Sequence, residues 1–158
     1  MIYKALEIIK NALADHLRLV PGLNITGGDS IALSHLVRPD GTLAVRDNTL
    51  AVTLVNIDED NTLKVRNPEE ESESSLNLTM LVSANYQNYG MALKYLSEVV
   101  KYFREKPVFT KEIIPEMDAS IKKIMIEHFS INFEQQYHLW SSIGAKYIPS
   151  VLYRVRIV

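Results

Sequence analysis

The segment that most constrains the fold is residues 49–57, which alternate as a β-strand does but are apolar on both sides. Successive side chains of a strand point to opposite faces of a sheet. One side of this strand would carry Leu50, Val52 and Leu54, and the other Thr49, Ala51, Thr53 and Val55. Such a strand belongs in the interior of a sheet that is covered on both faces. We therefore expect a layered fold, with other elements packed on either side of a sheet.

Three further segments predict strands by the same alternation, namely residues 76–86, 121–133 and 151–158. The second of these would place Phe129, Ile131 and Phe133 on one face. The third would turn Val151, Tyr153, Val155 and Ile157 inward and Arg154 and Arg156 outward. Residues 31–37 are a candidate short strand, and Pro39-Asp40-Gly41 predicts a turn after it.

Helical periodicity is present in three segments. Residues 1–19 carry an apolar stripe that ends before Pro21-Gly22, and its members are Ile2, Leu6, Ile9, Leu13 and Leu17. Residues 89–104 carry a second stripe of Ala92, Leu96, Val99 and Phe103, widened by Leu93 and Val100. Pro107 ends that helix, and an irregular connection is expected over residues 108–119. Residues 133–143 predict a short third helix, closed by Gly144 in the C-terminal capping position.

Residues 58–75 interrupt this pattern with a concentration of acid. The segment holds seven acidic and two basic residues, a net charge of −5, so the rest of the chain carries +3 to give the total of −2. Such a segment buries little apolar surface, and we expect a mobile loop between two antiparallel strands. Asp58, Glu59 and Asp60 are adjacent rather than alternating as in calcium-binding loops, so a solvated run is favoured over a cation site.

The order of these elements predicts an α+β fold in a single domain over residues 1–158. We expect a four- to five-stranded, mainly antiparallel sheet with two long helices and one short helix. Charged residues interrupt the apolar N-terminal run, and polar residues fill the longest uncharged stretch. Neither a signal peptide nor a membrane-spanning helix is therefore expected, and the expected location is the cytoplasm.

Residue types that carry catalysis form no recognisable set in this sequence. The four histidines show no metal-ligand spacing, and the absence of cysteine removes disulfides, thiol nucleophiles and cysteine-ligated metals. Glu134 and His138 lie four residues apart and would share a helix face, as an acid–base pair could. A surface hydrogen bond is the favoured interpretation of that pair. We therefore expect a protein that is not an enzyme and that has no cofactor and no metal.

The last quarter of the chain has the composition of an interaction surface. Its lack of acidic residues would also be explained by chance variation along the sequence. No acidic residue occurs from Gln135 to the end, whereas basic and aromatic residues do. Aromatic and arginine side chains dominate interface hot spots. The candidate contact residues are Glu134, Trp140, Lys146, Tyr147, Arg154 and Arg156. Their positive charge is too sparse for a nucleic-acid site.

The same quarter carries motifs with a family resemblance. They are Phe133-Glu134-Gln135, His138-Leu139-Trp140 and the run Gly144-Ala145-Lys146-Tyr147-Ile148-Pro149-Ser150-Val151-Leu152-Tyr153-Arg154-Val155-Arg156. Matching segments elsewhere are Met1-Ile2-Tyr3-Lys4-Ala5-Leu6, Val52-Thr53-Leu54-Val55-Asn56-Ile57, Ser83-Ala84-Asn85-Tyr86 and Lys106-Pro107-Val108-Phe109. Together they resemble the N-terminal domain of the cap, or tail-terminator, proteins of contractile injection systems. These systems are phage-tail-like particles of the antifeeding-prophage and virulence-cassette type.

The resemblance implies a tail-terminator-like fold and a structural role. Proteins of this kind form a hexameric ring that ends the inner tube and helps anchor the terminal sheath layer. The implied partners are further copies of the chain and the inner tube protein, with sheath protein as an additional candidate, and neither nucleic acid nor a membrane. The implied location is the cytoplasm during assembly and then the particle. Many relatives continue into a second domain.

Two expectations about mechanism accompany this role. Six weak contacts made at once bind strongly without any tight single site. Strand addition at a sheet edge is a natural mode of contact, and residues 151–158 are the candidate strand. The alternative function is a small soluble adaptor or ligand-binding α+β domain without catalysis.

Overall fold

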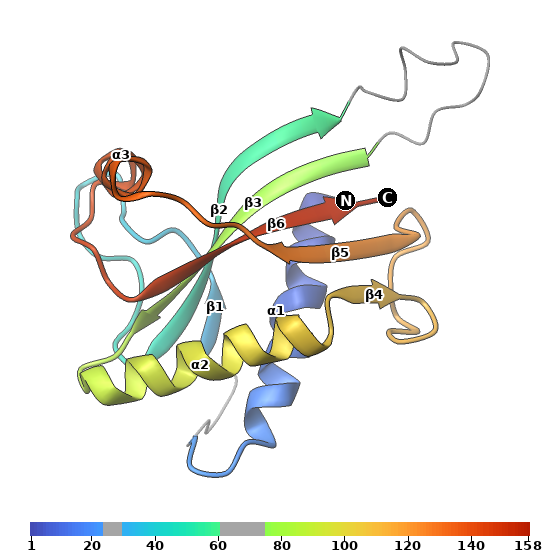
Figure 1. The fold of residues 1–158 in the computed structure, drawn as a ribbon, viewed down its shortest axis with the longest axis horizontal. Coiled ribbons are helices and arrows are strands. Elements are labelled where there is room, and N and C mark those ends of the chain that lie inside the picture. The colour runs from blue at the N-terminus through green and yellow to red at the C-terminus, as the bar shows by residue number, and fades with distance from the viewer. Residues whose placement is uncertain (24–29, 61–74) are drawn as a thin grey trace.

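The computed structural model describes residues 1–23, 30–60 and 75–158, which contain three helices and six strands (Figure 1). The helices are α1 (Ile2–Arg18), α2 (Tyr89–Glu105) and α3 (Phe133–Ile143). The strands are β1 (Ile31–Leu33), β2 (Thr49–Asp60), β3 (Ser75–Asn85), β4 (Val108–Thr110), β5 (Lys123–His128) and β6 (Ser150–Ile157). The α+β class is confirmed. None of the described helices combines the length and the hydropathy that a membrane span requires.

All six strands form one mixed sheet in the order β1-β2-β3-β6-β5-β4. Four of the five pairings are antiparallel, and only β1 with β2 is parallel. The expected sheet of four or five strands was therefore too small. The strand that was missed is β4, which was assigned to an irregular connection because three residues are too few to show alternation.

The β2–β3 hairpin is antiparallel, as predicted, but it extends into the acidic segment. Asp58 pairs with Asn77, Glu59 with Leu76, and Asp60 with Ser75. The prediction that the loop begins at residue 58 is therefore wrong. Acidic residues can continue the strand because the ladder consists of backbone hydrogen bonds and needs no apolar side chains. The rest of that predicted loop, residues 61–74, lies outside the described residues.

One face of the sheet is covered by α1 and α2 (Figure 1). The predicted stripe of α1 is confirmed at Leu6, Ile9, Leu13 and Leu17, which are buried against the strands, whereas Ile2 is half-buried. The stripe of α2 is confirmed at Ala92, Val99 and Phe103, but it widens to the opposite side from the one expected, because Tyr95 and Tyr102 are buried while Leu93 is exposed. Aromatic packing explains this difference. Tyr95 stacks on Tyr86 at a ring-centroid distance of 4.4 Å, and Tyr102 packs against Phe103 at 5.3 Å.

The opposite face is covered by α3 and residues 34–48, which confirms that β2 is buried on both sides. A second, smaller core forms here, and its buried members are Leu36, Val45, Ala51, Leu81, Trp140 and Leu152. The sheet thus separates two cores, and α3 is the only described helix on its side.

Two predictions about strands are corrected by the pairing. The strand expected over residues 121–133 spans only Lys123–His128, and Phe133 is an exposed first residue of α3 rather than a core residue. Asn132 ends the extended segment because its side chain accepts a hydrogen bond from Gln135 N and caps α3. Strand β6 lies between β3 and β5 and is paired on both edges, so it cannot be the edge that accepts an added strand.

Candidate interaction surface

In the described part of the chain, the histidines pair with at most one carboxylate each, as His16 does with Glu98 at 3.6 Å. His16 stacks on Tyr102 with ring centroids 4.6 Å apart, and His128 lies beside Ser130. His138 Nε2 is 3.8 Å from Glu134 Oε1, and both side chains are highly exposed, as the surface interpretation of this pair predicted. In residues 1–23, 30–60 and 75–158, no group of three or more His, Asp or Glu is arranged to hold a metal ion. The candidate functional sites described next are therefore exposed surfaces.

The six predicted contact residues lie on the side of the sheet that carries α3, but they fall in three separate places. Trp140, Lys146 and Tyr147 line one shallow depression on α3 and the turn that follows it. Arg154 and Arg156 lie on β6, and Glu134 lies on α3 beside His138. Whether these residues make contacts in an assembly stays a prediction.

Three exposed aromatic rings surround the depression, which has a volume of about 490 Å³. Phe133, Tyr137 and Tyr147 are 88%, 70% and 53% exposed. We call these three residues with Lys146 the aromatic patch. Phe133 and Tyr137 are one helical turn apart and therefore share a face of α3. Gly144 ends the helix with φ 79°, which returns the chain so that Tyr147 lies beside the helix.

Trp140 supports the patch from below. Its side chain is only 5% exposed and belongs to the second core, and its ring meets the Tyr147 ring edge-on at 5.3 Å. Trp140 would therefore act at an interface through Tyr147, whose position it fixes, more than through its own surface. Sequence reasoning missed Phe133 as a surface residue. Its spacing of four from Tyr137 was the available signal, and the competing strand prediction obscured it.

The two arginines of β6 are held by neighbours on the same face. The Arg154 guanidinium lies 4.8 Å from the centroid of the Phe129 ring, a cation–π contact. Arg154 is exposed, as predicted, and pairs across the sheet with Thr79 and Glu127. Arg156 is half-buried, and its Nη2 donates a hydrogen bond to Ser75 Oγ at 3.2 Å. Arg154 is therefore the more available of the two for a partner.

A second surface lies on the other side of the sheet, between α1, the end of α2 and the segment after β4. It is a groove of about 830 Å³ with an apolar lining that includes Ile8, Leu19 and Ile113. Carboxylates also line it, namely Glu7, Asp15, Glu105 and Glu116, together with the basic Lys106. We call it the acidic groove. The sequence does not predict it, because its walls come from segments about a hundred residues apart.

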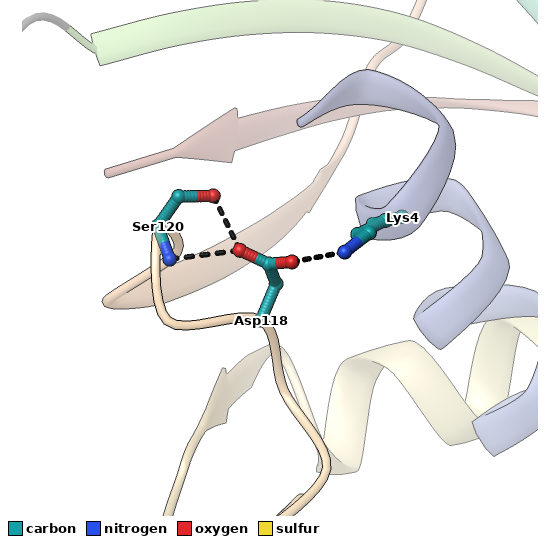
Figure 2. Close-up of polar contacts among 3 residues, drawn as sticks. All are labelled: Lys4, Asp118 and Ser120. Atoms are coloured by element: carbon teal, nitrogen blue, oxygen red, sulfur yellow. Dashed lines mark hydrogen bonds and ion pairs between the residues drawn. The ribbon is translucent and has the colours of Figure 1, made fainter.

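The outer wall of the acidic groove is fastened to α1 by Asp118 (Figure 2). Lys4 Nζ donates to one carboxylate oxygen, and Ser120 donates to the other from its backbone N at 2.8 Å and its Oγ at 2.6 Å. These donors, Lys4 first, hold the pKa of Asp118 well below its usual range. Residues 111–118 are thereby kept against α1.

The chain is thus an α+β domain with two distinctive exposed surfaces, the aromatic patch and the acidic groove. The chain belongs to the Pvc16 N-terminal domain family, whose model matches residues 5–158. This confirms the resemblance that the sequence motifs indicated. A comparison with curated proteins found no match.

Two solved structures share the fold. One is a sheath/tube terminator of a PVC extracellular contractile injection system in its extended state, with a TM-score of 0.63 and 15% identity. The alignment covers 99% of this chain and 55% of that one. The other is the tube-terminating cap of the anti-feeding prophage, with a TM-score of 0.54 and 16% identity, covering 94% of this chain and 52% of that one. The chain spans about half the length of each of these proteins.

Proposed function

We infer that this chain is a structural cap of a contractile phage-tail-like particle, assembled in the cytoplasm as a hexameric ring that ends the inner tube. The observation that carries this inference is the family match over residues 5–158, supported by a fold shared with a tube terminator and a tube-terminating cap. The ring would also help to anchor the last sheath layer. Further copies of the chain, the tube protein and the sheath protein are the proposed partners.

The physical requirements of a cap are compatible with this domain. A growing tube exposes a ring of binding sites that the next layer would occupy. A terminator must bind that ring while offering no copy of it on the far side. A head-to-tail interface that closes at six subunits meets this requirement, and six simultaneous contacts give strong binding from weak individual ones. The proposed contact residues are Glu134, Trp140, Lys146, Tyr147, Arg154 and Arg156.

The proposal is tested by assembling the tube protein with and without the full natural protein that carries this domain. Electron microscopy would measure tube length and the symmetry of the tube ends. We expect shorter tubes that carry a six-fold ring at one end, and unregulated lengths without the protein. Tubes of unchanged length, together with a chain that stays monomeric in their presence, would contradict the proposal and support a soluble adaptor instead.

A further inference from the structure

The aromatic patch and the acidic groove have complementary properties. Phe133 and Tyr137 present large apolar rings to solvent, and soluble proteins rarely leave such a cluster uncovered. Among the residues that line the depression of the patch, Lys146 is the only charged one. A partner for this surface should therefore offer an apolar cavity with negative charge at its rim.

The acidic groove offers that chemistry. Ile8, Leu19 and Ile113 give it apolar walls, and the last two of these side chains are exposed. Two of its carboxylates are already engaged, because Glu7 accepts from Tyr3 Oη at 2.6 Å and Asp15 from Arg18 at 2.7 Å.

The other two carboxylates of the groove, Glu105 and Glu116, have no ion-pair partner in the part of the chain that the structure describes. Lys106, the basic residue of the lining, lies over the Tyr102 ring at 5.7 Å. The rim is therefore suited to a cation that approaches with an apolar group.

The two surfaces lie on opposite sides of the sheet. In Figure 1, α3 is at the upper left on one side of the sheet, whereas α1, the end of α2 and β4 lie lower in the view on the other side. A second copy cannot reach both sides at once, so a contact between patch and groove cannot close as a two-fold dimer. It must instead repeat head to tail, and such a contact closes as a ring or grows as a filament.

We propose that the aromatic patch of one copy docks in the acidic groove of the next copy, with Lys146 facing Glu105 and Glu116. This contact would repeat between neighbouring subunits around the ring. The number of subunits, six, rests on the proposed function. The contact assigns each subunit one donor surface and one acceptor surface. Every subunit of a closed ring then uses both surfaces, which leaves β6 and its arginines free for the tube.

Cysteine crosslinking tests this contact, because the chain contains no cysteine of its own. Tyr137→Cys and Ile113→Cys are made separately in the full natural protein and mixed in the presence of tube protein and a short bismaleimide crosslinker. We expect linked dimers from the mixture and none from either variant alone, and a ladder up to six copies from the double variant. The matched control pairs Ile113→Cys with Tyr89→Cys, which is exposed on α2 outside both surfaces, and should give no dimer.

Charge exchange provides a second measurement that does not depend on crosslinker reach. Lys146→Glu and Glu116→Lys should each weaken association about fivefold, and the two variants mixed together should recover part of that loss. Tube length is measured on the same samples. Capped tubes without crosslinks or recovery would overturn this contact and leave the proposed function standing. Crosslinks without capped tubes would overturn the proposed function and leave the contact standing. Linked dimers in a sample that contains only the Tyr137→Cys variant would overturn the contact.

Discussion

Tyr137 and Trp140 lie three residues apart on α3 and differ in what surrounds them. Trp140 is buried in the second core, whereas Tyr137 is largely exposed. We expect Trp140→Ala to lower the free energy of unfolding by about 3–5 kcal/mol, because it leaves a cavity. Tyr137→Ala should change it by less than about 0.5 kcal/mol while impairing assembly. Urea denaturation measures both values, and equal losses in the two variants would contradict the assignment of Tyr137 to a surface.

Arg154 and Arg156 allow a test of the tube or subunit contact on β6. Reversing both charges with Arg154→Glu and Arg156→Glu should abolish binding in co-sedimentation with the tube protein. Arg154→Glu alone should weaken binding, because Arg154 is exposed and its guanidinium, which lies over the Phe129 ring, is the more available of the two. Lys101→Glu, on the exposed face of α2, is the matched control and should bind normally. Normal binding by the double variant would remove these arginines from the interface.

Asp118 gives a prediction about pH. Its pKa is depressed in the folded state by Lys4 and Ser120, so it stabilises the fold above its ordinary value of 3.8. That contribution is lost as the pH falls through the folded pKa. Urea midpoints of the wild type and Asp118→Asn should therefore differ near about pH 7, and the difference should narrow as the pH falls below 3.8. The variant should be the less stable at neutral pH, and a difference that grew on acidification would contradict the role given to the carboxylate.

At the scale of elements, the end of α3 is the point where backbone conformation positions the aromatic patch. Gly144 has φ 79°, and a Cβ there would meet no atom within 4 Å, so the cost of a side chain is conformational only. Gly144→Ala should therefore lower stability by about 1 kcal/mol. Gly144→Asn should lose less, because asparagine tolerates the left-handed region. Thermal unfolding compares the two variants, and equal losses would point to a steric cause instead.

Helices were predictable from this sequence where their stripe was regular. The ends of α1 and α3 follow from Pro21-Gly22 and from Gly144. The stripe of α2 followed at Ala92, Val99 and Phe103, but the side to which it widens did not. Hydropathy ranks Leu93 above Tyr95, whereas the structure buries the Tyr95 ring, which stacks on Tyr86. This stacking partner lies in the segment after β3, so it cannot be identified from the periodicity of the helix alone.

Strands were predictable as segments but not as neighbours. The interior position of β2 follows from its two apolar sides, and it is confirmed by the two cores. The order of the strands is a property of the whole sheet, which explains why β6 was mistaken for an available edge although β3 and β5 flank it. Short β4 carries too few residues for any pattern.

At the scale of the whole molecule, the sheet places the two candidate surfaces on opposite sides. The α3 side was foreseen in part from Trp140, Lys146 and Tyr147, which are consecutive or close in sequence. The acidic groove was not foreseen, because it forms where α1, the end of α2 and residues 113–116 lie side by side in the fold. A surface built from distant segments has no local signature, so charge totals alone could not locate it.

A ring made by head-to-tail contacts also predicts how defective subunits affect assembly. Ile113→Lys should disable the groove without unfolding the domain, because Ile113 is exposed. The variant keeps its patch, so it still enters a growing arc but cannot be joined by the next subunit. If it mixes randomly in equal amounts with the wild type, closed six-membered rings should fall to about one in sixty-four rather than one half. Native mass spectrometry of tube-bound rings measures this fraction, with Tyr89→Ser as a control that leaves it unchanged. A fall in simple proportion to the variant would mean that subunits bind the tube independently, without a shared ring.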